Sequence, residues 1–402
     1  MADNKDKKVL NVPHLRFPEF SGEWVETTLG KISEITKGSG ISKDQLSEQG
    51  SPCILYGELY TKYKSEIIDE VYSRTELDSS SLVKSKANDV IIPCSGETAI
   101  DISTARCVPF DNILLGGDLN IIRLKHDDGG FFAYQLNGAR KKDIARVAQG
   151  VSVVHLYGEN LKQIRVYHPN IEEQKKITRL LSLIDERIAT QNKIIEDLKK
   201  LKSAISKQLF AQKPNEWNRL DTLFSKGKAG GTPTSTNKEY YNGEIPFLSI
   251  SDITKQGKYV RYTENHLSRS GLANSSAWVV PEYSLIMSMY ASVGLVTINE
   301  IPITTSQAMF AMQLRDKDLL DYLYYYLSYF KYRHIHKYLE TGTQSNINAD
   351  IVRGIMIPTY GHSRNMEIAS TLQRIDAKID NELAVLELFN RQKRYLLSQM
   401  FI

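Results

Sequence analysis

The sequence predicts an α/β (α+β) protein with two similar globular domains, separated by a pair of long antiparallel coiled-coil helices in an internal pseudo-twofold repeat. Three observations predict this fold: an apolar heptad pattern occurs twice, polar residues interrupt both copies at the same places, and strand-like runs recur ahead of each copy. We expect five segments: a leading segment (1–22), a first globular domain (23–170), a first long helix (171–213), a second globular domain (214–362) and a second long helix (363–402).

Apolar, strand-like runs define the first globular domain and recur in the second. Residues 52–59 (PCILYGEL) match residues 246–253 (PFLSISDI) at a distance of 194 positions (246 − 52 = 194). A second strand is expected at residues 89–93 and again at residues 284–288. Each domain then has about 150 residues, which is an ordinary size for one domain.

The first long helix is predicted from apolar residues that step by three and four, which is the period of a heptad seam. The seam positions are Ile177, Leu181, Ile184, Ile188, Ile195, Leu198, Ile205 and Leu209. Gln191 and Lys202 interrupt the seam. A helix over residues 172–210 would be about 58 Å long, at about 1.5 Å per residue.

The second long helix repeats this seam at a constant distance. Its positions are Ile368, Leu372, Ile375, Ile379, Leu386, Phe389, Leu396 and Met400. Glu382 and Lys393 interrupt it. The first and last seam residues of the two helices differ by the same number (368 − 177 = 191 and 400 − 209 = 191). Because loops tolerate insertions and paired elements do not, this pattern indicates a duplication followed by divergence of the loops.

Each helix has one apolar stripe and therefore needs a partner to bury it. Periodicity alone predicts a dimerisation coiled coil between two chains almost as well as a pair within one chain. A tethered partner makes the association effectively unimolecular, which favours the antiparallel pair within the chain. We expect the long stems of Lys202 and Lys393 to reach water near the helix ends, and Gln191 and Glu382 to fix register or orientation.

The composition is typical of a folded chain outside the membrane. Of 402 residues, 41% are hydrophobic and 24% are charged, as in ordinary globular proteins. The apolar runs fall far short of the roughly 20 residues that span a bilayer, and the start is charged, so we expect a cytoplasmic location. Cys53, Cys94 and Cys107 lack C-x-x-C spacing and are expected to be reduced thiols. The formal charge of +4 is weakly basic, so local patches would have to meet any anionic partner.

Signatures of catalysis and metal binding are missing from the sequence. It contains no G-x-x-x-x-G-K-[ST], G-x-G-x-x-G, H-E-x-x-H or G-x-S-x-G motif, and no Asn/Asp-Pro-Pro-aromatic tetrapeptide. His334 and His336 are two positions apart in a helical-looking stretch, where they would point to different sides. We expect no catalytic residue, metal or cofactor in this chain. The alternatives are an enzyme with unfamiliar motifs and a structural coiled-coil protein whose domains bind protein or carbohydrate.

Tyrosine-rich, basic and polar segments are the candidates for a binding surface. Seven of the 22 tyrosines lie in residues 321–338, where their spacing predicts that most rings pack in the core and that Tyr332 and Tyr338 are exposed. Basic residues occupy the corresponding place in the first half. Gly-containing loops recur at residues 37–49, 149–157, 226–241 and 341–348. Any one of them could be a plain turn, but amide, hydroxyl and cationic side chains also match base edges and phosphates.

The candidate DNA contacts come from these loops and basic segments. They are Lys37, Ser39, Lys43, Arg140, Lys141, Lys142, Ser152, His155, Lys228, Thr232, Thr234, Ser235, Asn237, Lys238, Tyr332, Arg333, Gln344 and Asn346.

Several blocks resemble the DNA-specificity subunits of type I restriction-modification enzymes. They are NVPHLRFPEF (11–20), EEQKKITRLLSLIDERI (172–188), GGTPTSTNKEYYNGEIPFLSISDI (230–253) and PEYSLIMSMYASVG (281–294). The resemblance covers essentially the whole chain. It is weaker in the first half, where KGSGISKDQ replaces a GGTP-type loop and CSGETAIDIS replaces SMYASVG. The two domains are therefore expected to be different subtypes with different half-sites.

The resemblance implies a non-catalytic subunit that reads a bipartite, asymmetric site in double-stranded DNA. Each globular domain would be a target-recognition domain for one half-site, and the helices would set the unread gap. The implied partners are two methyltransferase subunits, which bring S-adenosylmethionine, and endonuclease/translocase subunits, which use ATP and magnesium. The resemblance also implies that the leading segment (1–22) packs near the C-terminus.

Overall fold

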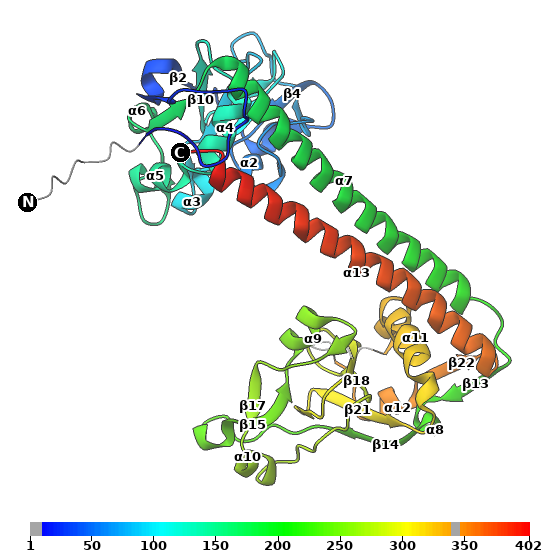
Figure 1. Ribbon diagram of the computed structural model, residues 1–402. Coiled ribbons are helices and arrows are strands. Elements are labelled where there is room, and N and C mark those ends of the chain that lie inside the picture. Colours follow the sequence, from blue (N-terminus) through cyan, green and yellow to red (C-terminus); the bar gives the residue numbers. More distant parts are fainter. Residues whose placement is uncertain (1–9, 339–345) are drawn as a thin grey trace, which may run out of the picture. The chain divides into compact units, whose positions relative to one another are not determined.

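The computed structural model describes residues 10–338 and 346–402, and the chain divides into two compact units. Unit 1 consists of Met1–Ile194 and Leu383–Ile402, and unit 2 of Ile195–Glu382. Each unit contains one globular domain together with the start of one long helix and the end of the other (Figure 1). In the described part of the chain, no helix is both long and apolar enough to span a membrane.

Unit 1 is built on a four-stranded antiparallel sheet with the strand order β2-β10-β6-β8. Its strands are β2 (Ser33–Lys37), β10 (Leu119–Leu124), β6 (Asp89–Pro93) and β8 (Arg106–Val108). A second sheet has the order β3-β5-β4-β9, with strands β3 (Leu46–Ser47), β5 (Ser73–Thr75), β4 (Ser51–Ile54) and β9 (Leu114–Leu115). The remaining pairs are β1 (Val25–Thr28) with β12 (Arg165–His168) and β7 (Ser95–Gly96) with β11 (Val154–His155).

Short helices connect these strands. They are α1 (Leu29–Ile32), η1 (Lys43–Gln45), α2 (Glu58–Thr61), α3 (Ala99–Ile102), α4 (Gly129–Asn137), α5 (Lys141–Val147) and α6 (Gly158–Lys162). The α4 helix is buried at eight of its nine positions. It therefore forms the centre of the unit 1 core, together with strands of the first sheet and the beginning of the first long helix.

Unit 2 is built on a five-stranded sheet with the order β14-β21-β18-β19-β16. Its strands are β14 (Phe224–Ala229), β21 (Met309–Leu314), β18 (Leu285–Ser288), β19 (Val296–Asn299) and β16 (Tyr259–Val260). A three-stranded sheet contains β17 (Asn265–Leu267), β15 (Tyr241–Leu248) and β20 (Thr304–Thr305), and β13 (Glu216–Arg219) pairs with β22 (Met356–Thr359). The helices are α8 (Leu220–Leu223), η2 (Lys238–Tyr240), α9 (Ile250–Gln256), α10 (Arg269–Ala273), η3 (Lys317–Leu319), α11 (Leu320–Arg333), η4 (Ile335–Lys337) and α12 (Ala349–Gly354).

The two domains repeat one topology, which confirms the predicted duplication. The order β2-β10-β6-β8 in unit 1 has its counterpart in β14-β21-β18-β19 in unit 2, and both units contain one short parallel pair, β4-β9 or β15-β20. The main difference is β16, which pairs in parallel with β19 in unit 2. At the same place unit 1 has only an isolated parallel bridge between Ile67 and Cys107.

The matching runs at residues 52–59 and 246–253 are not continuous strands. Each strand ends earlier, at Ile54 or Leu248, and a short helix follows. The Glu58 carboxylate accepts the backbone N–H of Leu55, at 3.0 Å, and the Asp252 carboxylate accepts the N–H of Ser249, at 2.8 Å. Asp252 forms a capping box with Ser249 at the start of α9, which is why the chain turns there, and Glu58 makes its contact from the first residue of α2.

The two long helices are α7 (Ile171–Phe210), with 40 residues, and α13 (His362–Gln399), with 38 residues. Of the sixteen seam residues named above, nine are buried and seven are half-buried. In unit 1 the end of α13 meets the start of α7, where Lys393 pairs with Asp185. In unit 2 the end of α7 meets the start of α13, where Lys202 pairs with Asp376. The helices thus run antiparallel within one chain, side by side in Figure 1, as the sequence predicted.

The expectation that Lys202 and Lys393 reach water was wrong. Their side chains are only 28% and 15% exposed, and each binds a carboxylate across the helix pair. These two seam positions therefore form ion pairs between the helices, Lys202 with Asp376 and Lys393 with Asp185. The stem of a lysine follows the apolar seam in either case, but the position of its charge depends on what lies opposite.

The leading segment packs against the end of the chain within unit 1. The N–H of Leu15 donates to the carbonyl of Gln399 at 2.9 Å, and Arg16 forms an ion pair with the buried Glu173 at 2.7 Å. Trp24 packs edge-on against Phe401, with ring centroids 6.3 Å apart. These contacts attach both segments to the start of α7.

Candidate nucleic-acid interface

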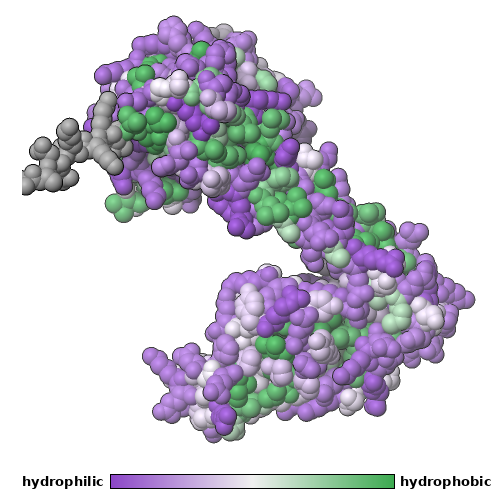
Figure 2. Space-filling view, in the orientation of Figure 1, coloured by the Kyte–Doolittle hydropathy of each residue, from purple (hydrophilic) through white to green (hydrophobic). Residues whose placement is uncertain are grey.

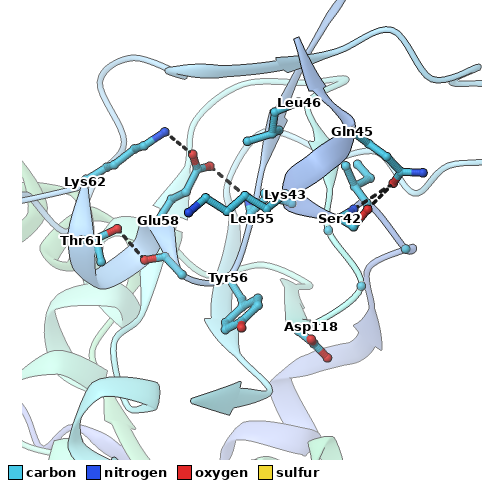
Figure 3. Close-up of a pocket in the computed structure, with 15 residues that line it drawn as sticks. Ser42, Lys43, Gln45, Leu46, Leu55, Tyr56, Glu58, Thr61, Lys62 and Asp118 are labelled. Carbon is cyan, nitrogen blue, oxygen red and sulfur yellow. Dashed lines mark hydrogen bonds and ion pairs between the residues drawn. The ribbon is translucent and has the colours of Figure 1, made fainter. Parts of the chain in front are cut away.

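A hollow of about 960 Å³ lies in the first globular domain (Figure 3). It is lined by residues 40–43 and 45–46, by residues 55–58 with Thr61 and Lys62, and by residues 116–118. The first of these segments belongs to the polar loop at residues 37–49 that the sequence singled out. The structure therefore combines that loop with the segment that follows it closely in sequence, residues 55–62, and with the distant residues 116–118.

Hydrogen bonds within the lining hold its polar groups in place. Glu58 is 6% exposed and binds the ammonium of Lys62 at 2.6 Å. The side-chain oxygen Oε1 of Gln45 accepts both the N–H and the hydroxyl of Ser42 at 2.9 Å. Lys43 is exposed at the rim. Lys62 compensates the charge of Glu58, so the hollow presents amide, hydroxyl and ammonium groups, which are types that contact base edges and phosphates, together with the exposed carboxylate of Asp118.

Two glycines of this loop have very different surroundings. A Cβ atom on Gly38 would lie 2.0 Å from the carbonyl oxygen of Gly116, whereas a Cβ on Gly40 would meet nothing within 4 Å. Ser39, between them, accepts the N–H of Val83 on its hydroxyl at 2.8 Å. The predicted DNA contact at Ser39 is thus a hydroxyl that already holds the loop in place.

Replacing Gly38 with alanine is expected to destabilise the first domain by about 2 kcal/mol or more, because the new methyl group overlaps a backbone carbonyl that cannot rotate away. Replacing Gly40 with alanine, two residues along the same loop, is the matched control and should change the stability by less than about 0.5 kcal/mol. Urea unfolding measures both variants. Equal effects of the two substitutions would contradict the close approach at Gly38.

The basic segment of the first domain is divided between surface and interior positions. Helix α4 stops before Gly138, so the long tyrosine-rich helix of unit 2 corresponds here to two helices, α4 and α5. Arg140 donates to the carbonyl of Ile402 and stacks over the ring of Tyr167 at 5.2 Å. Lys141 is half-buried and burial lowers its pKa. Lys142 is exposed. Arg140 and Lys141 are thus held within unit 1, whereas the third predicted phosphate contact, Lys142, lies at the surface.

The other predicted contacts of the first domain lie on exposed loops. Lys37 is exposed at the end of β2, and Ser152 and His155 are exposed in the loop before α6. The His155 ring stacks on Tyr157, with centroids 6.1 Å apart. Backbone hydrogen bonds join His155 to Gln149 in both directions, at 2.7 and 2.9 Å. This loop is therefore a fixed hairpin-like turn with an exposed pair of rings.

In the second domain the polar loop at residues 226–241 packs tightly at its glycines. A Cβ atom on Gly230 would lie 1.9 Å from the carbonyl oxygen of Thr305. Thr232 donates its hydroxyl to Gln307 at 2.5 Å, and Asn237 caps η2 by accepting the N–H of Glu239. Among the predicted contacts here, Thr232 and Asn237 thus stabilise the loop. The exposed predicted contacts in this loop are Lys228, Thr232, Thr234, Ser235 and Lys238.

The tyrosine-rich helix α11 has one face in the core. Tyr322, Tyr325 and Tyr326 are buried, which confirms that most of these rings pack. Tyr332 is 79% exposed and Arg333, next to it, is exposed as well. Asn346 is half-buried. Gln344, the remaining predicted contact, lies outside the described residues.

Tyr56 and Lys62 also line the hollow, although the sequence patterns did not predict them as contacts. The Glu58 to Lys62 spacing is a charge pair four residues apart on a helix, which was a detectable signal. In the second domain Lys226 lies over the ring of Trp278, 4.2 Å from its centroid. No pattern in the sequence connects these two residues.

The described residues contain neither a candidate metal site nor an exposed thiol. Within residues 10–338 and 346–402 there is no group of three or more His, Cys, Asp or Glu residues that could hold a metal ion. The cysteines are free and buried, and burial raises the pKa of Cys53 and of Cys94 to about 11 and that of Cys107 to about 12. Such thiols are protonated at neutral pH and are poor nucleophiles.

The surface seen in Figure 2 is mostly hydrophilic and is interrupted by apolar patches. Some exposed apolar side chains belong to the long helices. On α7 they include Leu183 and Leu201, and on α13 they include Leu388 and Tyr395. Apolar groups that remain on the outside of a helix pair are available to a protein partner.

Comparisons with known proteins agree with this architecture. A family profile described as "Type I restriction modification DNA specificity domain" matches residues 21–200 and 214–387. The putative type I restriction enzyme MjaX specificity subunit of Methanocaldococcus jannaschii is 25% identical over 289 residues, covering 67% of this chain and 66% of the relative. The type I restriction enzyme MjaIX specificity subunit of the same organism is 25% identical over 195 residues, covering 47% of this chain and 44% of the relative.

One solved structure has the same fold along nearly the whole chain. It is the crystal structure of the type I restriction-modification system S subunit from M. genitalium, with a TM-score of 0.61 and 16% identity. The match covers 97% of this chain and 99% of that one. Each of the two family segments contains one globular domain and much of the long helix that follows it.

Proposed function

Because the chain belongs to the family of type I restriction-modification DNA specificity domains, we propose that it reads a bipartite, asymmetric site in double-stranded DNA. Each globular domain contacts one half-site, and the antiparallel helices set the unread gap between them. The observation that carries this proposal is the duplication: one strand order occurs twice, each copy has its own polar loops, and one continuous helix joins the two.

Differences between the repeated domains support an asymmetric site. The loop at residues 37–45 lines a hollow beside Lys62 in the first domain, whereas the glycine-rich loop of the second domain is closed against Thr305 and Gln307. Base readout depends on which side chains reach a groove edge. Two domains with different loop geometry therefore read different half-sites.

We further propose that the chain is the non-catalytic member of a larger complex. Relatives are named specificity subunits, and the described residues offer no metal site. Two methyltransferase subunits dock on the helices and domains, and the exposed apolar residues of α7 and α13 support such docking. In this assembly S-adenosylmethionine is bound by the methyltransferase subunits. Endonuclease/translocase subunits with ATP and magnesium complete it.

Separate variants in the two domains should change separate half-sites. Arg333→Ala, with Tyr332 left in place, removes an exposed cation from the second domain, and Lys43→Ala removes one from the first. We expect each variant to weaken binding of its own half-site about tenfold, since a good base contact contributes about 1–3 kcal/mol. Sequencing of methylated adenines from a random DNA pool measures the base preference on both sides. A change in the same half-site for both variants would refute the assignment of one domain to each half.

The whole proposal is tested by reconstitution. The purified chain alone, with labelled S-adenosylmethionine and DNA, should transfer no methyl groups, and the complex with methyltransferase subunits should modify two adenines at a fixed distance. DNA binding by the complex should weaken steeply as salt increases, because phosphate contacts release counterions. Methyl transfer by the chain alone would support the enzyme alternative. A complex that protects no DNA sequence selectively would support the structural coiled-coil alternative.

A further inference from the structure

A buried ionic cluster joins the helix pair to the globular domain in unit 1. The ammonium of Lys393, on α13, lies 2.6 Å from Asp185 on α7 and 2.5 Å from Glu66 in the domain. The hydroxyl of Tyr134, on α4, donates to the other oxygen of Asp185 at 2.7 Å. Lys393 also lies 5.7 Å from the centroid of the Tyr134 ring. One lysine, one aspartate and one tyrosine thus connect both helices with the core of the domain.

Unit 2 contains the same three residue types in the same arrangement. The ammonium of Lys202, on α7, lies 2.5 Å from Asp376 on α13. The hydroxyl of Tyr325, on α11, donates to the other oxygen of Asp376 at 2.8 Å. Lys202 lies 5.3 Å from the centroid of the Tyr325 ring.

The two clusters are related by the internal repeat at every position. The lysines, the aspartates and the tyrosines each differ by the same number (393 − 202 = 191, 376 − 185 = 191 and 325 − 134 = 191). The contacts are nevertheless exchanged between the halves. In each unit the aspartate and tyrosine come from one half of the repeat, and the lysine comes from the helix of the other half.

A neighbouring position shows that the surroundings diverged while this triad was kept. The carbonyl of Glu66 accepts the N–H of Cys107 at 2.8 Å, and the carbonyl of Lys258 accepts the N–H of Ile298 at 2.8 Å, so Glu66 and Lys258 occupy equivalent places. Their charges are opposite. Lys258 is compensated by Asp321, at 2.5 Å. The charge beside the triad therefore differs between the two halves, whereas the lysine, aspartate and tyrosine of the triad are the same in both.

We propose that the two Lys–Asp–Tyr triads are the positioning residues that fix the register of the α7–α13 pair. An apolar seam with a seven-residue period accepts a shift by one heptad, because apolar residues again face apolar residues. That shift moves each lysine about 10 Å along its partner helix and leaves the carboxylate without its cation, which is strongly unfavourable at the buried Asp185 and less so at the half-buried Asp376. The tyrosine adds a contact from the domain, so the helix register and the domain position are set together.

Burial opposes the charges of both members of the ion pair in unit 1, and it raises the pKa of Asp185 although Lys393 lies beside it. Burial opposes the charge of Lys393, but Glu66 and Asp185 outweigh it and raise the pKa of the ammonium.

The consequence of a fixed register for recognition rests on the function proposed above, in which the helices set the unread gap. One register gives one number of unread base pairs, whereas a helix pair with two registers would give two different gaps.

The test measures the register directly, in the full-length chain, by pulsed electron spin resonance. Spin labels are placed on cysteines introduced at Lys199 and Asp380, which are exposed positions on α7 and α13 within unit 2. The three native cysteines are buried and are not expected to react. The unmodified triads should give one narrow distance between the labels.

Three variants and a control separate register from stability. Lys202→Met with Lys393→Met removes both cations, and adding Asp185→Asn, Asp376→Asn and Glu66→Gln neutralises both triads and the buried glutamate that Lys393 also binds. Lys202→Arg with Lys393→Arg keeps the charges, and Lys207→Met changes an exposed lysine of α7. We expect the neutralised chain to regain part of the thermal stability that the loss of both cations removes, because no unpaired carboxylate is left beside either triad. Its distance distribution should contain a second component at longer distance, because one helix is then displaced by about 10 Å, one heptad, along the other. The arginine variant and the control should keep the single narrow distance.

Two outcomes would overturn the proposal. A neutralised chain with one unchanged distance would show that the apolar seam sets the register, and a neutralised chain that does not fold would assign the triads to stability alone. A complex of the neutralised chain with methyltransferase subunits should methylate adenines at more than one gap. If the unmodified chain directs no methylation, the proposed function fails, and the spin-label distances still decide the inference about register.

Discussion

Replacing Leu181 with aspartate is expected to destabilise unit 1 by about 4 kcal/mol or more. Leu181 is 0% exposed and belongs to the core cluster that contains Trp24, Phe131 and Phe401. The substitution removes buried apolar volume and places a carboxylate where no cation or donor is available, and both changes are costly. Amide hydrogen exchange should show that strand β10 loses its protection while strand β21, in unit 2, keeps it.

The matched control is a substitution at Leu183, which lies two residues further along α7 and is 37% exposed. Leu183→Asp introduces the same charge on the outer side of the same helix. It should change the free energy of unfolding by less than about 0.5 kcal/mol. Equal loss of protection in β10 for the two variants would mean that helix propensity, and not burial, decides the effect.

Removing one heptad from each long helix is expected to shorten the unread gap by about three base pairs. The two ion pairs place residues opposite each other whose numbers add to the same value (185 + 393 = 578 and 202 + 376 = 578). Deleting residues 190–196 and 382–388 therefore removes facing turns and leaves both triads intact. Each helix becomes about 10 Å shorter, and DNA rises about 3.4 Å per base pair. Mapping of methylated adenines in a genome that expresses the complex measures the gap.

A deletion in one helix only serves as the control for this experiment. Removing residues 190–196 from α7 while α13 keeps its full length separates one lysine from its aspartate. We expect loss of the folded helix pair, because the seam and the two triads then demand different registers. An unchanged gap in the chain with both deletions would contradict the proposal that the helices set the distance.

The candidate interface could be predicted in part from residue types. Exposed positions such as Lys43, Lys238 and Tyr332 lie where polar and basic patterns placed them. Ser39 and Arg140 matched the same pattern, yet their polar atoms bind Val83 and Ile402 inside the first unit. Residue type indicates what a side chain can bind, and only the packed neighbours decide whether it is already occupied.

What the sequence determined by itself was the duplication and the seam. The constant distance of 191 positions and the heptad period are properties of the chain, and they predicted two domains and an antiparallel helix pair. Only the tertiary structure decided the roles of Lys202 and Lys393. Their aspartates lie far away in the sequence, on the opposite helix. A periodic pattern describes one face of one helix, whereas the position of a buried charge depends on the groups that folding brings against that face.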